Sequence, residues 1–431
     1  MLICGVLACT AQNPAYEAGS AGGSGSGAST AGTDAGPGGN PSGPGSETEG
    51  TGGATGETDS IGTTDDPTTG TGGPSGCPGG LVPGQMCHGL DDLVIPGNCV
   101  PRPVEIADLD GDGYGEILIG CEGGSLLSFA GSAAGPATRP SVIGHAGALP
   151  RDIEVGQLDG GPNLDILVVN EVLSYGVRVF TDGDGEYVLT DYDVGEHPTR
   201  GAIGNWNGAG GPDIAVTLTL GDEVAFLSNI DASGSFAPGE SIGTPDEPLD
   251  LALGDLDEDG LDDLAVVSRS GNTLSVFLNR LGAMAPVEQT YGQEPGAEPN
   301  RILINNIEPD DTVDILLTRG GKSGLRIYRG MGEGAYDPEP PEVVGLGQQL
   351  QGLDDGDFDG NERPDAVLVD RDGQMLYFLM LIMPPDMVEL ESLMVDGVPW
   401  DIAAGDINGD GVSDVVVSQE NDRVTIVLSG A

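Results

Sequence analysis

Four short segments of the sequence carry acidic or amide side chains at their first, third, fifth and ninth positions. They read DLDGDGYGE from Asp108, DLDEDGLDD from Asp255, DFDGNERPD from Asp357 and DINGDGVSD from Asp406. Carboxylate and amide oxygens are the ligands that a hard cation such as Ca²⁺ prefers. A small residue at the fourth or sixth position lets the backbone curl, so that alternate side chains point at one centre. The spacing therefore predicts a calcium site in each of the four loops, completed by the carbonyl of the seventh residue.

The predicted ligands occupy positions 1, 3, 5, 7 and 9 of each loop. They are Asp108, Asp110, Asp112, Tyr114 and Glu116; Asp255, Asp257, Asp259, Leu261 and Asp263; Asp357, Asp359, Asn361, Arg363 and Asp365; and Asp406, Asn408, Asp410, Val412 and Asp414. Without a cation the carboxylates of a loop would repel one another, so we expect metal binding to stabilise the fold. An EF-hand is excluded because it needs a glutamate at position 12 and an exiting helix, whereas here position 12 lies in an apolar run.

The loop pattern recurs in weaker form, so that seven loops begin at residues 108, 157, 205, 255, 306, 357 and 406, 48 to 51 residues apart. The loops at 157 and 205 have Gly161 and Ala209 at the fifth position, and we expect them to be hairpins without metal. The loop at 306 retains Asn306, Glu308, Asp310 and Asp314, for which we expect weak binding at most. A period of this length is typical of a repeat architecture.

Each repeat unit contains the pattern of four short strands. A segment leads into the loop, an apolar run leaves it, a third strand carries an aromatic residue in six of seven units, and a fourth ends near a glycine. Four strands per unit indicate a propeller blade, although seven units could also stack as an open solenoid. The last unit lacks its fourth strand, and residues 92–95 supply one. The predicted fold is therefore an all-β, seven-bladed propeller of four-stranded blades, closed by an N-terminal strand in the last blade.

The N-terminal region divides into two segments before the propeller, which we place at residues 77–431. Residues 10–76 are rich in Gly, Ser and Thr and contain no Lys or Arg, which is typical of a disordered tether. Residues 1–9, MLICGVLAC, resemble the end of a bacterial lipoprotein signal, which implies lipidation of Cys9. The run lacks the positive start and the length of a full signal, so we expect the true start to lie upstream. The alternative is that Cys9 has no special role.

Four further cysteines stand at 77, 87, 99 and 121. They form no CxxC pair, so a zinc site is not expected, and an exported chain favours disulfides. Of the three pairings we favour Cys77 with Cys87 and Cys99 with Cys121, the latter joining the entry segment to the first hairpin.

The charge of the chain limits its partners. Seventy acidic against 15 basic residues give a formal net charge of −55. Nucleic acid and anionic membrane surfaces are excluded, because both require basic patches. We expect membrane association only through the lipid anchor, and a monomer.

The loops, their spacing and the strand pattern resemble the FG-GAP or VCBS repeats of the integrin α-subunit N-terminal propeller and of secreted bacterial proteins. The resemblance covers about residues 90–431, although the literal FG-GAP tetrads are missing and three loops depart from the motif. It implies calcium hairpins on a lower face. It also implies that partners bind an upper face, built from the links between blades and the turns between their second and third strands.

The links between blades contain a second repeat. A proline stands seven positions before six of the seven loops. The two positions after this point supply the candidate ligand residues Arg102, Arg151, Arg200, Arg301 and Trp400. Arginine forks would suit carboxylate or sulfate groups, and an exposed indole would suit sugar stacking. The alternatives are that the arginines pair with neighbouring acids and that Trp400 plugs the channel.

These features favour a surface-tethered binding or adhesion module that is not an enzyme, with a protein or glycan partner. The expected location is the bacterial outer membrane or cell surface as a lipoprotein, or otherwise secretion. The sequence contains no phosphate loop, nucleophile elbow or histidine-rich metal set. The alternative is a polysaccharide-active lyase or hydrolase, or a lectin, on the same propeller, because the sequence does not show which acids face each other.

Overall fold

The computed structural model describes residues 90–97, 99–171, 176–183, 186–280, 286–307, 312–338, 342–343, 346–347, 349–382, 387–420 and 422–430. The lipidation predicted at Cys9, the tether over 10–76 and the bridge between Cys77 and Cys87 lie outside these residues.

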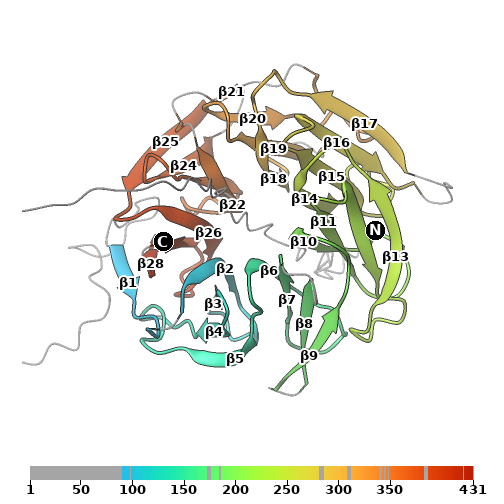
Figure 1. The fold of residues 1–431 in the computed structure, drawn as a ribbon. Helices are drawn as coiled ribbons and strands as arrows, with labels where there is room; N and C mark the ends of the chain where they lie inside the picture. Colours follow the sequence, from blue (N-terminus) through green and yellow to red (C-terminus); the bar gives the residue numbers. More distant parts are fainter. Residues whose placement is uncertain are drawn as a thin grey trace, which may run out of the picture. The chain divides into compact units, whose positions relative to one another are not determined.

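The described residues form seven antiparallel four-stranded sheets arranged as the blades of a propeller (Figure 1). Blade 1 contains β2 (Pro101–Ala107), β3 (Glu116–Cys121), β4 (Ser125–Phe129) and β5 (Ser141–His145); blade 2 contains β6 (Pro150–Gly156), β7 (Asp165–Asn170), β8 (Val177–Asp182) and β9 (Tyr187–Tyr192). Blade 3 contains β10 (Pro198–Gly204), β11 (Asp213–Leu218), β12 (Glu223–Ser228) and β13 (Ala237–Gly243); blade 4 contains β14 (Pro248–Gly254), β15 (Asp263–Ser268), β16 (Thr273–Leu278) and β17 (Val287–Gly292). Blade 5 contains β18 (Pro299–Asn305), β19 (Asp314–Arg319), β20 (Leu325–Tyr328) and β21 (Glu342–Val343); blade 6 contains β22 (Leu350–Gly356), β23 (Asp365–Asp370), β24 (Met375–Ile382) and β25 (Met387–Met394).

Blade 7 closes the ring with strands from both ends of the propeller. It contains β26 (Pro399–Gly405), β27 (Asp414–Gln419), β28 (Arg423–Val427) and the N-terminal β1 (Leu90–Leu93), which pairs antiparallel with β28. The inner strand β26 packs beside β2 of blade 1, so the ring is closed and an open solenoid is excluded. The closing strand was predicted in the right blade, but it begins two residues earlier than expected and ends at Leu93.

The core of the propeller lies between blades. Every residue of the second strands β3, β7, β11, β15, β19, β23 and β27 is buried, because each sheet is covered on both faces by its neighbours. One cluster joins Val104 and Ile119 of blade 1 to Ala403 and Val416 of blade 7. Outer strands such as β13 are mostly exposed. Each blade is therefore stabilised mainly by the blades beside it, and the apolar runs that leave the loops supply this contact.

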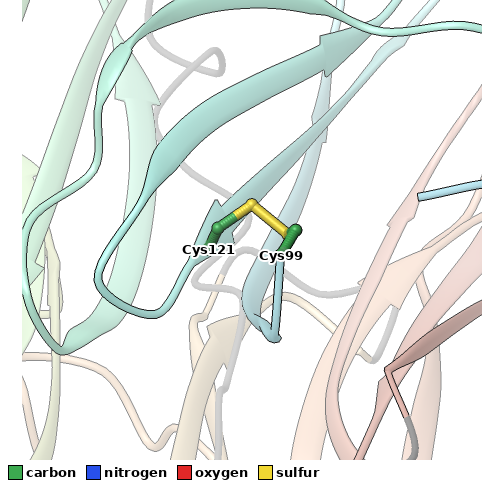
Figure 2. The surroundings of a disulfide bond; sticks show 2 residues. All are labelled: Cys99 and Cys121. Atoms are coloured by element: carbon green, nitrogen blue, oxygen red, sulfur yellow. A yellow bond between two sulfur atoms is a disulfide. The ribbon is translucent and has the colours of Figure 1, made fainter. Parts of the chain in front are cut away.

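A disulfide joins Cys99, in the segment between β1 and β2, to Cys121 at the end of β3 (Figure 2). Both cysteines are buried. The bond corresponds to one of the two pairings favoured by the sequence. It fixes the segment that follows the closing strand onto the first blade.

Candidate metal loops and axial cluster

The first carboxylate of each acidic loop organises the backbone around it. In the loop at 108, Asp108 Oδ1 accepts hydrogen bonds from the N–H of Gly111 at 2.8 Å and of Asp112 at 3.0 Å, and its Oδ2 accepts one from Gly113 at 2.9 Å. Asp406 makes the same three contacts with its own loop. The loop is therefore wound around this side chain, which holds the third and fifth side chains on the same short turn.

This winding requires a left-handed backbone at positions 4 and 6. Gly111 and Gly113 have φ of 74° and 89°, which glycine adopts without strain. Glu258 and Glu362 hold a φ of 63° at the equivalent places in the loops at 255 and 357. A non-glycine residue in this region costs of order 1 kcal/mol and persists only where the surroundings impose it. The loop geometry is thus kept even where glycine is lost.

Acidic side chains converge in three of the predicted loops. One ligand oxygen from each member of a group lies within 4.8 Å of the others in Asp108, Asp110 and Glu116; in Asp255, Asp257 and Asp259; and in Asp357, Asp359 and Asp365. The donors are all oxygens, as a hard cation requires. The Oδ1 atom of Asp257 is also buried without a hydrogen-bond partner, while its Oδ2 accepts a hydrogen bond from Arg280 Nε at 2.9 Å. The residues present therefore fit a calcium ion.

The ninth-position acid has a second role that the sequence reasoning missed. In blade 7, Asp414 Oδ2 accepts a hydrogen bond from Ile407 N at 3.0 Å and its Oδ1 accepts one from Ser429 N at 2.8 Å. The side chain thus ties the start of the loop to the end of β28. Burial raises the pKa of Asp414 to about 8 and that of Glu116 to about 7. The ninth position is acidic in all seven loops, including those that lack the other ligands. This pattern in the sequence could have indicated a structural role for the ninth-position acid that does not depend on a metal.

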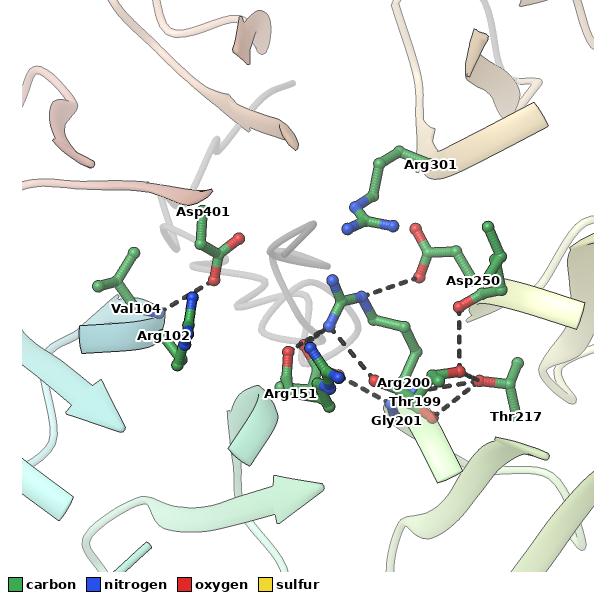
Figure 3. A network of polar contacts seen from close by, with 12 residues as sticks. Arg102, Val104, Arg151, Thr199, Arg200, Gly201, Thr217, Asp250, Arg301 and Asp401 are labelled. Carbon is green, nitrogen blue, oxygen red and sulfur yellow. Dashed lines mark hydrogen bonds and ion pairs between the residues drawn. The ribbon is translucent and has the colours of Figure 1, made fainter. Parts of the chain in front are cut away.

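The four candidate arginines of the upper face lie on the inner strands β2, β6, β10 and β18, and Figure 3 shows the side chains of Arg200 and Arg301 beside the carboxyl group of Asp250. Arg102 pairs with Glu122 at 2.7 Å, and Arg151 pairs with Glu171. Arg200 and Arg301 are only 4% and 2% exposed. Arg102 and Arg151 therefore pair with neighbouring acids, as the alternative interpretation of the sequence expects. Arg200 and Arg301 are buried and do not belong to an open surface.

Trp400 is not the exposed indole that the sugar-stacking interpretation required. It is 6% exposed, and the Arg102 guanidinium carbon lies 4.1 Å from its ring centroid. The guanidinium carbon of Arg151 lies 6.0 Å from the same centroid. The physical reason is that the ring packs under the two cations, which shield it from solvent. Trp400 therefore provides a buried aromatic face on which the guanidinium groups of Arg102 and Arg151 pack.

Aspartates of the inner strands connect neighbouring blades through backbone N–H groups. In each of four cases the carboxyl group accepts a hydrogen bond from a backbone N–H of the following blade. The pairs are Asp152 with Gly201 N at 2.8 Å, Asp250 with Ile302 N at 3.0 Å, Asp354 with Ala404 N at 2.7 Å, and Asp401 with Val104 N at 3.0 Å. The last pair crosses the boundary where blade 7 meets blade 1. Sequence reasoning had treated such acids only as partners for arginine, because the sequence does not show which side chain faces the next blade.

The inner strands also bring together an axial cluster of acids, formed by Glu105, Asp152, Glu154, Asp250 and Asp354. Glu154 is buried, and burial together with the nearby carboxyls of Asp152, Glu105, Asp250 and Asp354 raises its pKa well above the usual range. Burial and the surrounding carboxyls thus favour the protonated form of Glu154. No local sequence pattern indicates this cluster, because its members come from four blades.

Comparison with known families supports the fold type. The FG-GAP repeat family model matches residues 398–427, which include β26, β27 and β28. Together with the seven blades, this match confirms the predicted resemblance to an FG-GAP propeller of the integrin α type. No curated protein matches the chain in sequence. Within the described residues, no helix is long and apolar enough to span a membrane.

Several solved structures have a similar fold. BBS1N in complex with ARL6DN, soaked with mercury, has a TM-score of 0.57 at 12% identity, covering 79% of this chain and 96% of that chain. Virginiamycin B lyase from Staphylococcus aureus has a TM-score of 0.54 at 11% identity, covering 79% and 99%. Its catalytically inactive variant with quinupristin has a TM-score of 0.54 at 12% identity, with the same coverage. At these identities the similarity shows the fold alone.

Proposed function

We propose that the chain is a calcium-stabilised propeller, held at the cell surface by its N-terminal region, that binds a protein or glycan partner without catalysis. The lipid anchor at Cys9 would place it on the bacterial outer membrane or cell surface, and without the anchor the protein would be secreted. Calcium would be held by the acidic loops, and the partner by the upper face.

The observation that carries the calcium proposal is the buried, unpartnered Oδ1 of Asp257, which lies in the converging group with Asp255 and Asp259. A buried carboxylate oxygen without a partner is unfavourable unless a cation or a donor satisfies it. Bound calcium would neutralise the converging carboxylates. The protein's own part is to hold those oxygens on a preorganised turn, which the hydrogen bonds from Asp259 N and Gly260 N to the Asp255 carboxylate achieve.

The upper face offers the partially exposed arginines Arg102 and Arg151, whose side chains are 22% and 16% exposed, above the ring of Trp400. A carboxylate or sulfate of a partner would compete with Glu122 and Glu171 for these guanidinium forks. The similar fold of BBS1N, solved in complex with ARL6DN, supports a propeller of this kind as a protein-binding scaffold.

The test combines stability and binding in the full-length protein. Thermal unfolding is followed in excess calcium and in EGTA; each occupied site adds about 2.7 kcal/mol when calcium is about 100-fold above its dissociation constant. An unchanged midpoint contradicts structural calcium. Binding to an array of sulfated and uronic-acid glycans is then compared between wild type and Arg102→Glu/Arg151→Glu. If the protein is a binder, the wild type binds a glycan and leaves it intact, and the variant no longer binds that glycan. Release of unsaturated, ultraviolet-absorbing products identifies a lyase instead.

A further inference from the structure

The fully described loops differ in what fills the centre of the turn. We infer that Gln157 and Asn207 replace the cation in blades 2 and 3, so that calcium acts on the blades that keep the ligand set, which are blade 4 and the contiguous blades 6, 7 and 1. This inference rests on the proposed calcium binding and specifies where it acts.

Gln157 occupies the first position of the loop in blade 2. Its Oε1 accepts a hydrogen bond from Gly160 N at 2.9 Å, the contact that Asp108 Oδ1 makes with Gly111. Its Nε2 donates to the carbonyl oxygens of Gly161 at 2.6 Å and Asn163 at 3.0 Å. The Asn163 carbonyl is the seventh-position oxygen, which the other loops would direct at calcium. The longer glutamine side chain therefore keeps the acceptor of the first position and adds a donor where the loop would otherwise need a positive charge.

Asn207 serves the same purpose in blade 3 from the third position. Its Oδ1 accepts a hydrogen bond from Ala209 N at 2.7 Å, which maintains the turn. Its Nδ2 donates to Oδ1 of the buried ninth-position acid Asp213 at 2.6 Å. An aspartate at this position could not donate and would face Asp213 as a second carboxylate. In both blades an amide thus satisfies an oxygen that belongs to the ligand set elsewhere, and the fifth-position ligand is absent.

The loops of blades 6, 7 and 1 are joined to one another, as are those of blades 1 and 2 and of blades 3 and 4, where Leu164 N donates to the Leu109 carbonyl at 3.1 Å and Asp262 N to the Asn205 carbonyl at 3.2 Å. Ser413 N donates to the Asp357 carbonyl at 2.8 Å, and Gly115 N donates to the Asp406 carbonyl at 2.7 Å. Each donor N–H belongs to the peptide group whose carbonyl, that of Val412 or Tyr114, is the seventh-position oxygen. A cation held at that carbonyl would polarise the peptide and strengthen its N–H as a donor to the preceding blade.

The arc formed by blades 6, 7 and 1 includes the place where the ring closes. Blade 7 contains the closing strand β1, and blades 6 and 1 flank it. Calcium in this arc would therefore stabilise the two boundaries that flank the blade with the closing strand, whereas blades 2 and 3 would close their loops without metal. Blade 4 retains the ligand set, with Arg280 already paired to Asp257.

The test is hydrogen exchange of the full-length protein, with calcium as the only probe, in excess calcium and in EGTA. We expect calcium to slow exchange in 108–116, 357–365 and 406–414 by about tenfold or more, while 157–165 and 205–213 change by less than about twofold. Slowing of 157–165 to the same extent as 108–116 overturns this inference alone. Absence of any calcium response overturns both this inference and the calcium proposal.

Isosteric variants test the amides directly. Gln157→Glu removes both donated hydrogen bonds and places a carboxylate against two carbonyl oxygens, so exchange in 157–165 should rise by about tenfold in EGTA and return toward wild type in calcium. Gln157→Met removes the donors without adding charge, and its exchange should rise in both conditions. Asn207→Asp should behave as Gln157→Glu does, in 205–213. Wild-type exchange of Gln157→Glu and Asn207→Asp in EGTA contradicts the role of the amides.

Discussion

The carboxyl group of Asp401 fixes the boundary where the ring closes, and its removal should lower the stability of the whole propeller. Its Oδ2 accepts a hydrogen bond from Val104 N at 3.0 Å, between β26 of blade 7 and β2 of blade 1. Asp401 is 1% exposed and Val104 is 2% exposed, so water cannot replace the lost acceptor without entering the core. Asp401→Ala therefore leaves a buried N–H group unsatisfied.

The magnitude follows from this single contact. An unsatisfied buried donor costs about 1–3 kcal/mol, and the alanine variant also loses the packing of the carboxyl group, so we expect a loss of about 3 kcal/mol. Burial raises the pKa of Asp401 well above the usual range, so the variant gains little from removing a buried charge near neutral pH. At roughly 2 cal/mol/K per residue, a domain of about 340 residues loses about 4 °C in melting temperature. Asp401→Asn retains an acceptor of the same shape and should melt within about 1 °C of wild type.

The assay is thermal unfolding in saturating calcium, combined with hydrogen exchange at the Val104 amide. The surface variant Asp372→Ala, on an exposed turn residue after β23, controls for a change of charge alone. Asp401→Ala should melt lowest of the three and expose the Val104 amide to exchange. A melting temperature for Asp401→Ala that matches Asp401→Asn would refute the reasoning, because the two variants differ in the acceptor.

Two further predictions concern the axis and the disulfide. The pKa of Glu154 is raised above its ordinary value of 4.5, so the folded protein keeps a proton that the unfolded chain releases. Stability should therefore fall by about 1.4 kcal/mol for each pH unit between that value and the folded-state pKa, and urea unfolding should show a shallower fall for Glu154→Gln between pH 5 and 7.5. The bridge between Cys99 and Cys121 encloses a separation of 22 residues, so Cys99→Ser/Cys121→Ser should lose about 3 kcal/mol in the same urea assay. An equal pH slope in both proteins, or an unchanged midpoint in the serine variant, would contradict these predictions.

The fold could be predicted because the same sequence pattern recurs in all seven repeat units. The loop, the apolar run after it and the aromatic of the third strand recur in phase, so errors in one unit are corrected by the others. Closure followed from counting strands at the two ends. The exact bounds of β1 could not be predicted, because they depend on its pairing with β28, in which Leu93 lies opposite Val424.

The candidate sites could be predicted only where the ligands are close in sequence. The acidic loops are local turns, so spacing alone indicates convergence, as Asp108, Asp110 and Glu116 show. The upper face is built from strands about fifty residues apart, and no local pattern shows that Trp400 lies beneath Arg102. The same limit hid the surroundings of Glu154, because its acidic neighbours Glu105, Asp250 and Asp354 come from other blades.

The contacts of the acidic side chains explain how a chain with 70 acidic and only 15 basic residues can fold. Many of the acidic side chains in the loops and at the blade boundaries are hydrogen-bonded to the backbone instead of being paired with lysine or arginine. Asp406 accepts three loop N–H groups, Asp414 accepts two, and Asp401 accepts one from the next blade. Each such contact satisfies a backbone donor that would otherwise be orphaned in a turn or at a blade boundary. Acidic residues in these positions therefore serve the closure of turns and blades, and the oxygens that remain are those available to a cation.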